Sequence, residues 1–263
     1  MSTNENLVSI VMPCYNGARH IEDSIKSVLN QCYQNWELIV VDDLSKDNSV
    51  AIVDKFVKKD SRIKLVAKET NSGCAASRNQ AVELARGDFI AFLDCDDIWD
   101  ENFLTEQIQF MKHENLDFSC SSYRMIDENN REILYPHIVP PKKFSFESLL
   151  RYNIVGTLTA IYRVKSVGKI YFDVNLHSVR DDYACWRDIL RKSSRAQSNP
   201  KILASYRVHS NSVTSNKFKL IRSHFNFLTK REKLSFFKAS HYTLIWGIRG
   251  FRKFYNFFPK GTE

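Results

Sequence analysis

Three aspartates, Asp94, Asp96 and Asp97, lie within four residues directly after the apolar run 89–93. The run has the length and composition of a strand that is buried on both faces. Carboxylates gathered in this way cost free energy unless a cation neutralises them. A divalent metal ion prefers carboxylate oxygens and can bind phosphate oxygens at its remaining positions. The cluster is therefore a candidate site for a metal ion and a phosphate-bearing ligand. A solvated acidic turn, with Asp97 capping the next helix, is the structural alternative.

The segments that must position this cluster alternate between strands and helices. Pro13 is expected to end the first strand, and Asn16 and Ser45 are expected to cap the first and second helices. Short connections between alternating strands and helices predict an α/β fold with a Rossmann-like, mostly parallel central sheet and helices on both faces. The expected strands of this half are 7–12, 36–41, 62–66 and 88–93. Farther along the chain the pattern predicts a loop at 136–141 and strands at 157–163 and 204–208.

Polar residues follow three of these strands, at the edge where open α/β sheets bind their ligands. They are the stretch 13–16, the pair Asp42 and Asp43, and the acidic cluster at 94–97. Neither a G-x-G-x-x-G fingerprint nor a Walker loop is present. The sequence therefore disfavours a nicotinamide, flavin or P-loop ATP enzyme, and favours an anion held by metal over one held by a glycine-rich loop.

Composition limits the class of protein further. The six cysteines of the 263 residues form no CxxC pair, which is typical of reduced thiols rather than of a disulfide framework or zinc site. Residues 1–6 lack an apolar signal core, and no uncharged apolar run approaches the roughly 20 residues of a transmembrane helix. We therefore expect a cytoplasmic protein.

The positive charge is concentrated at the end of the chain. Residues 217–263 contain eleven Lys/Arg and two Glu, so their net charge is +9, whereas that of the whole chain is +8. The first 216 residues are therefore close to neutral.

Four stretches resemble family 2 glycosyltransferases of the GT-A fold, in the family's order and spacing over residues 7–100. The resemblance continues more weakly to about residue 215, through Asp181–Tyr183 with Trp186 and through Tyr206–His209. It implies transfer of a sugar from a UDP-sugar donor, with inversion at the anomeric carbon. It also implies a nucleotide-sugar-binding half at 1–110 and an acceptor-binding half with the catalytic base at 111–216. The basic, aromatic helical tail at 217–263 is distinguished by its composition and matches no motif of the family. The four stretches are 8–16, 40–47, 71–79 and 94–97.

The resemblance also implies roles for single residues. Asp43 accepts a hydrogen bond from uracil, whereas Asp42, one step earlier on its strand, points to the opposite face. Arg78 either helps to close over the nucleotide or forms a structural ion pair. The full set of implied nucleotide-sugar-binding residues is Pro13, Tyr15, Asn16, Asp43, Asn71, Arg78 and Asp94.

The chemical step has its own implied residues. Asp96 matches the metal ligand of the family's D-x-D signature, and His209 matches a histidine that completes the metal or diphosphate shell. The ion, Mn²⁺ or Mg²⁺, neutralises the diphosphate of the leaving nucleotide. Asp182 matches the base that takes the acceptor proton. Asp181 remains the alternative, because it stands where the family usually has Glu.

The tail, 217–263, combines its cations with many aromatic residues, a composition typical of interfacial helices on anionic membranes. A helix folded back on the catalytic domain is the structural alternative, and nothing in the first 216 residues supports a nucleic-acid partner. We expect an enzyme bound peripherally to the inner face of the cell membrane. It would extend a lipid-linked or cell-surface glycan such as lipopolysaccharide or capsule. A sugar nucleotidyltransferase and a non-catalytic nucleotide-sugar-binding or scaffolding protein are the alternatives.

Overall fold

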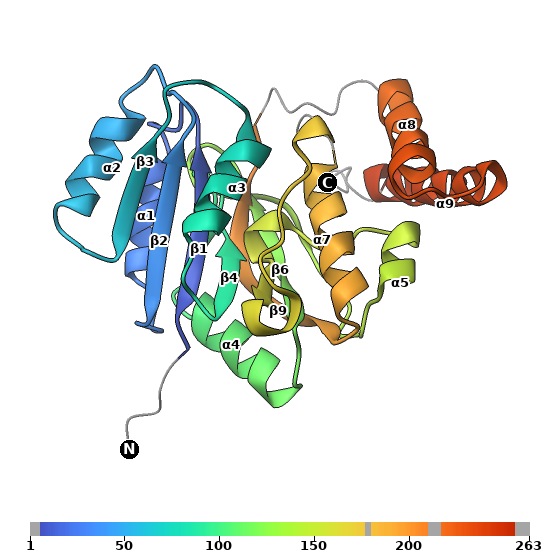
Figure 1. Ribbon diagram of the computed structural model, residues 1–263, viewed down its shortest axis with the longest axis horizontal. Coiled ribbons are helices and arrows are strands. Elements are labelled where there is room, and N and C mark those ends of the chain that lie inside the picture. The colour runs from blue at the N-terminus through green and yellow to red at the C-terminus, as the bar shows by residue number, and fades with distance from the viewer. Residues whose placement is uncertain (1–5, 177–179, 210–216, 256–263) are drawn as a thin grey trace, which may run out of the picture.

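A nine-stranded sheet forms the centre of the protein, with helices on both faces (Figure 1). The computed structural model describes residues 6–176, 180–209 and 217–255. The strand order is β3-β2-β1-β4-β8-β6-β9-β5, and β7 pairs with β6. The strands are β1 Val8–Cys14, β2 Trp36–Asp42, β3 Ile63–Ala67, β4 Phe89–Phe92, β5 Ile98–Trp99, β6 Phe118–Ile126, β7 Glu132–His137, β8 Ile161–Arg163 and β9 Ala196–Arg207. The helices are α1 Ile21–Leu29, α2 Ser49–Val57, α3 Cys74–Leu84, α4 Phe103–His113, α5 Phe146–Arg151, α6 Val164–Val167, α7 Asp181–Lys192, α8 Lys217–Asn226 and α9 Phe236–Tyr255.

The parallel pairings are concentrated in the first half of the sheet. β3, β2, β1 and β4 are all parallel, so their carboxyl ends lie at one edge. The second half is mixed, because β8 runs antiparallel to β4 and β6, whereas β9 runs parallel to β6. The α/β class and the helices on both faces are thus as expected. The antiparallel strands come from the part of the chain where the strand–helix alternation ceases.

Two apolar layers fix the helices to the sheet. Along β1 the side chains alternate: Ile10 and Met12 pack into the layer under α1, α2 and α4, whereas Val11 packs into the layer under α3 and α7. All three are fully buried, as is Trp186 of α7. Strands covered on both faces need this continuous apolar composition, which explains why their sequences lack a polar alternation.

Three local expectations about β1 and the first two helices are wrong. β1 continues through Pro13 to Cys14, since β4 pairs with β1 only as far as Val11 and one edge of β1 is free at Pro13. Asn16 does not cap α1, which begins at Ile21. Ser45 does not cap α2, which begins at Ser49. The side chains of Asn16 and Ser45 instead form hydrogen bonds within the loops beside Asp42 and Asp43.

The second half also differs from its expected elements. Residues 157–159 form a 3-10 turn before β8 rather than the start of a strand. The segment expected as a loop at 136–141 begins inside β7, and β9 starts eight residues before the expected 204–208. The antiparallel partners that decide these boundaries are far apart in the sequence, so local pattern does not reveal them.

The described part of the tail packs against α7 (Figure 1). The carboxylate of Glu232 lies 2.5 Å from the guanidinium of Arg187, and both side chains are fully buried. Phe227 packs on Tyr183 with ring centroids 5.1 Å apart, and Arg231 pairs with Asp188 at 2.5 Å. The tail therefore belongs to the folded domain, as the structural alternative anticipated. Within 6–176, 180–209 and 217–255, none of the helices has both the length and the hydropathy that crossing a membrane requires.

Removing the Glu232 carboxylate should destabilise the whole domain. Glu232→Ala leaves the buried Arg187 guanidinium without its counter-charge, and such a loss costs about 3–5 kcal/mol. The free energy of unfolding in urea measures this. Glu22→Ala is the matched control, because Glu22 pairs with Lys26 on the exposed face of α1 and its loss should leave the free energy of unfolding nearly unchanged. Equal effects of the two substitutions would contradict the anchoring role of Glu232.

Candidate functional site

A cavity of about 360 Å³ opens at the carboxyl ends of the parallel strands; we call it the Asp43 cavity. It brings together residues that are separated by up to 83 positions (13 to 96) in the sequence. Tyr15 stands at its edge with half of its surface exposed. The lining residues are Pro13, Cys14, Tyr15, Asp43, Asn71, Gly73, Cys74, Ser77, Asp94, Cys95 and Asp96.

Asp43 is held by three donors inside this cavity. Its Oδ1 accepts hydrogen bonds from Lys68 Nζ at 2.6 Å and from the Ser72 amide at 3.0 Å. Its Oδ2 accepts one from the Gly73 amide at 2.7 Å, which leaves an acceptor position on Oδ2. Burial would raise the pKa of Asp43, but Lys68 and the two amides outweigh it and hold that pKa below its usual value. Asp43 is therefore a fixed carboxylate that can accept one further hydrogen bond.

Asp42 and Asn16 organise the loops around this cavity. Asp42 accepts hydrogen bonds from the amide and the hydroxyl of Ser45, so its role in the structure is a local one. Asn16 has a backbone φ of 51°, and its side-chain oxygen accepts the Lys46 amide proton at 2.8 Å. Asn71 donates to the Asp43 carbonyl. Asn16 is absent from the cavity lining, whereas Asn71 lines it.

Arg78 links the acidic cluster to α7. Its Nη2 lies 2.7 and 3.0 Å from the carboxylate oxygens of Asp94, and its Nη1 lies 3.6 Å from Oδ2 of Asp181. The Arg78 side chain is buried, and burial alone would lower its pKa, but Asp94 leads the interactions that raise it instead. Arg78 thus has the structural ion pair that was one of its two expected roles. The pair turns Asp181 away from the cavities and toward the core.

His209 contacts Asp96 at the outer side of the cluster. The His209 Nε2 lies 2.7 Å from Asp96 Oδ2, and its Nδ1 lies 2.7 Å from Glu128 Oε1. Glu128 also contacts His20 and Arg19, both at 2.8 Å. Burial would lower the pKa of His209, but its bonds to Asp96 and Glu128 raise it above the usual value. The structure therefore brings together the two side chains that the sequence assigned to a metal shell.

Asp97 and Arg207 hold the loop after β4 in place. Asp97 is buried and accepts the Arg207 amide proton at 2.9 Å, so it does not cap α4, whose N-cap is Asn102. Burial, with the charges of Asp96 and Asp94, raises the pKa of Asp97 well above its usual value. The guanidinium of Arg207 bonds the Asp96 carbonyl at 2.8 Å and the Asp127 carbonyl at 2.7 Å. This clamp ties the acidic loop to the turn that carries Glu128.

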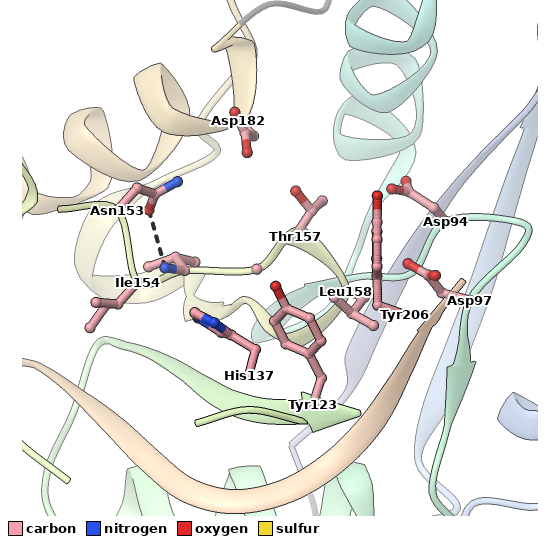
Figure 2. Close-up of a pocket in the computed structure, with 12 residues that line it drawn as sticks. Asp94, Asp97, Tyr123, His137, Asn153, Ile154, Thr157, Leu158, Asp182 and Tyr206 are labelled. Carbon is pink, nitrogen blue, oxygen red and sulfur yellow. Dashed lines mark hydrogen bonds between the residues drawn. The ribbon is translucent and has the colours of Figure 1, made fainter. Parts of the chain in front are cut away.

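A second cavity of about 340 Å³ adjoins the first; we call it the Asp182 cavity. Figure 2 shows Asp182 at one side, Asp94 and Asp97 beside Tyr206 at another, and the rings of Tyr123 and His137 close together. Asp94 lines both cavities. The lining residues are Asp94, Asp97, Tyr123, His137, Asn153, Ile154, Val155, Gly156, Thr157, Leu158, Asp182 and Tyr206.

Asp182 is the carboxylate of the α7 start that faces this cavity, whereas Asp181 does not line it. Burial, followed by the charge of Asp181, raises the pKa of Asp182 above its usual value. The Tyr183 amide, which donates to Asp182 at 2.6 Å, opposes this rise. A carboxylate with a raised pKa is a stronger base than an exposed one, so Asp182 is suited to accept a proton.

Several residues that line the two cavities or contact their lining were not singled out from the sequence. Lys68 directly follows β3, so its place at a strand end was a usable signal for an anion contact. Tyr206 lay inside a matched stretch without a role. Tyr123 approaches Gly156 so closely that a Cβ at position 156 would lie 2.7 Å from the Tyr123 ring. Nothing local in the sequence reveals that contact.

The donor chemistry of Asp96 and His209 fits a divalent ion. A carboxylate and an imidazole, with phosphate oxygens from a ligand, are a common combination for Mn²⁺ and related metals. Within the described residues, no group of three or more His, Cys, Asp or Glu side chains is arranged to hold a metal ion. The two side chains can therefore supply part of a coordination shell, and a bound ligand must supply the rest.

The chain belongs to glycosyl transferase family 2, whose family model matches residues 9–170. It is 39% identical over 226 residues to the Escherichia coli protein named UDP-Glc:alpha-D-GlcNAc-diphosphoundecaprenol beta-1,3-glucosyltransferase WfgD, with 86% of each chain covered. It is 36% identical over 240 residues to TuaG of Bacillus subtilis, a glycosyltransferase named for teichuronic acid biosynthesis, covering 91% of this chain and 94% of TuaG. The protein is therefore a glycosyltransferase.

Solved structures confirm the GT-A fold. Staphylococcus aureus TarS 1-349, crystallised with UDP-GlcNAc, matches with a TM-score of 0.73 at 21% identity, over 94% of this chain and 73% of TarS. The mannosyltransferase PcManGT of Pyrobaculum calidifontis, crystallised with GDP-Man and Mn²⁺, matches with a TM-score of 0.66 at 17% identity, over 92% and 70% of the two chains. At this identity the likeness establishes the fold, and the ligands are those of the two neighbours.

Proposed function

We propose that this glycosyltransferase moves one sugar from a UDP-sugar to a hydroxyl of a lipid-linked glycan acceptor by a single displacement with inversion. The observation that supports this most strongly is the pair of adjoining cavities, with Asp43 in one, Asp182 in the other and Asp94 in the wall of both. Transfer between two substrates needs two sites that meet at the reacting atoms.

The Asp43 cavity suits the nucleotide. The acceptor position left on Asp43 Oδ2 can take the N–H of a uracil ring, and Tyr15 and Pro13 offer surfaces for base and ribose. Asn71 keeps the loop before α3 against Asp43. Asp94, with its charge balanced by Arg78, is placed to accept hydroxyl protons of the ribose or of the donor sugar.

Asp96 and His209 would hold a Mn²⁺ or Mg²⁺ ion at the diphosphate, as such an ion accompanies GDP-Man in the PcManGT neighbour. When bound, the ion supplies positive charge that stabilises the departing nucleotide. Glu128 and Arg207 contribute by fixing the orientations of His209 and of the Asp96 loop.

In the Asp182 cavity, Asp182 would take the proton from the attacking hydroxyl as the new bond forms. Asp181 is engaged with Arg78, which favours Asp182 over Asp181 as the base. Tyr123, Tyr206 and His137 present ring surfaces on which a sugar ring can pack, while Asn153 and Thr157 can bond its hydroxyls. The WfgD relative acts on a sugar joined to a lipid through a diphosphate, and an acceptor of this class fits these features.

The tail would bind the anionic inner surface of the cell membrane. Phe237, Leu244 and Ile248 are spaced by seven and four residues, so they form one stripe along α9, and they are 85%, 64% and 47% exposed. Exposed Lys233 and Lys238 lie in the same segment. Cations beside an apolar stripe are what an anionic interface attracts. This surface would bring the enzyme to its lipid-linked acceptor.

The metal proposal can be tested without turnover. Asp96→Asn should weaken Mn²⁺ binding in the presence of UDP at least tenfold, as removal of supporting groups around metals commonly does. Electron paramagnetic resonance of free Mn²⁺ measures this. The control is Asp88→Asn, an acid outside both cavities. Unchanged Mn²⁺ affinity in Asp96→Asn would contradict the role of Asp96.

The base proposal predicts a loss of chemistry with little loss of donor binding. Asp182→Asn preserves shape but cannot take a proton, so transfer should fall by about 10²–10⁴-fold. In the wild type, transfer should decline as the pH falls through the raised pKa of Asp182, because only the deprotonated carboxylate accepts a proton. Release of UDP from a panel of UDP-sugars with a diphosphate-linked lipid acceptor measures both. Loss of UDP affinity with intact turnover of bound donor would instead place Asp182 outside the chemical step.

The membrane proposal predicts a specific effect of the α9 stripe. Phe237→Ser with Leu244→Ser should lower binding to anionic vesicles roughly tenfold or more, since each apolar side chain contributes about 1.5–3 kcal/mol when fully buried. Ile133→Ser with Ile138→Ser, on exposed residues of β7 and the segment after it, should have little effect. Cosedimentation with phosphatidylglycerol-containing and neutral vesicles compares them. Equal losses in both pairs, or no preference for anionic vesicles, would contradict this role of the tail.

A further inference from the structure

Arg180, two residues before Asp182, is a cation that has no anionic partner among the residues that the structure describes. It is half-buried, directly precedes α7 and has a left-handed backbone with φ 72°. Among the described residues its guanidinium forms no ion pair and no hydrogen bond, and its Nε is buried without an acceptor. Burial lowers the pKa of Arg180 from its usual value, as expected for a cation that lacks a counter-charge. An anionic ligand would offset this cost.

The tail holds this guanidinium by a ring contact. The Arg180 guanidinium carbon lies 4.6 Å from the ring centroid of Trp246 in α9. Trp246 in turn stacks on His224 of α8 at 4.8 Å, and His224 lies 6.2 Å from the Tyr183 ring of α7. Stacking uses the flat face of a guanidinium and leaves its in-plane N–H donors available. The Arg180 guanidinium is therefore held in place by Trp246, and its in-plane N–H groups remain available to bind an anion.

We propose that Arg180 binds the phosphate group through which the acceptor sugar is joined to its lipid carrier, with Trp246 as the positioning residue. The inference rests on the proposed function. In such an acceptor, the hydroxyl at Asp182 and the phosphate on the anomeric carbon lie on different sides of one sugar ring. Arg180 and Asp182 flank the same helix start, so both can be reached by one sugar phosphate. The planar fork of arginine matches phosphate oxygens.

The direction of the lipid agrees with this assignment. Beyond the phosphate, the chain of the acceptor would continue past Trp246 along α9, whose exposed stripe begins at Phe237 and includes Leu244. In Figure 1, α8 and α9 lie beside the end of α7 at which Asp181 begins the helix. One helix pair would thus serve both the membrane and the acceptor headgroup.

The donor carries the same phosphate chemistry, so the two sources must be distinguished. Arg180 does not line the Asp43 cavity, in which Asp96 and Asp94 face the donor. Arg180 does not line the Asp182 cavity either, but it directly precedes α7, two residues before the Asp182 that enters this cavity. Its position beside Asp182 favours the phosphate of the acceptor over that of the donor.

The test compares two acceptors of equal chain length: an alkyl diphosphate of N-acetylglucosamine and an alkyl glycoside of the same sugar. The measured quantity is the ratio of their kcat/KM values. Arg180→Asn removes the charge, and Asn tolerates a left-handed backbone. It should lower the ratio about 10–100-fold, the size of a lost hydrogen bond to a charged group. Arg180→Lys should recover part of the preference, and Trp246→Leu should raise KM for the diphosphate acceptor with little change in kcat.

Lys112→Asn is the matched control, since it removes one exposed cation of α4, outside both cavities, and should leave the ratio unchanged. An unchanged ratio in both Arg180 variants would overturn the inference. Slower transfer to both acceptors to the same extent, with weaker UDP binding by calorimetry, would also overturn it by assigning Arg180 to the donor. Wild-type protein that releases UDP from no UDP-sugar with either acceptor would overturn the proposed function, and this inference with it.

Discussion

The arrangement of the site depends on how one buried arginine balances two acidic segments. Arg78 contacts Asp94, which follows β4, and Asp181, which begins α7. Without this cation, two carboxylates from distant parts of the chain would lie together in a partly buried region, and that is unfavourable. With it, Asp94 can face both cavities while Asp181 is drawn inward and Asp182 is left at the cavity. Neutralisation by Arg78 therefore also determines which of the two adjacent carboxylates, Asp182, faces the cavity.

The tail shows that packing on the domain and an exposed apolar surface are compatible in one element. Glu232 and Phe227 attach the segment to α7 through buried contacts, whereas Phe237 and Leu244 face outward from α9. A helix has enough separate faces for both tasks. Since its inner contacts reach α7, the exposed stripe of α9 is held at a fixed place relative to Asp182. The observed packing on the domain and the membrane contact that we propose would use different faces of the same helices.

The sequence predicted the parallel half of the fold and its ligand edge well, because apolar strands and acidic strand ends are local patterns. Asp43, Asp94 and Asp96 were all found in this way, and the structure places them around one cavity. Asn16 was misjudged as a helix cap, since its left-handed turn depends on a bond to Lys46 thirty residues away. The rings that line the Asp182 cavity were missed for the same reason. Tyr123 and Gly156 approach each other only through antiparallel pairing.

Because Asp94 lines both cavities, a ligand in one cavity can influence a ligand in the other. Its carboxylate lies in the wall of both, so the charge that one substrate presents to Asp94 alters the field experienced by the other. A donor bound in the Asp43 cavity would use hydrogen-bonding capacity of Asp94 and so limit what Asp94 offers to a ligand in the Asp182 cavity. The pKa of Asp182 is raised by other causes, namely burial and the charge of Asp181. Coupling through Asp94 would therefore act on the position of the acceptor, and the orientation of Asp182 toward the acceptor hydroxyl would matter as much as its proton affinity.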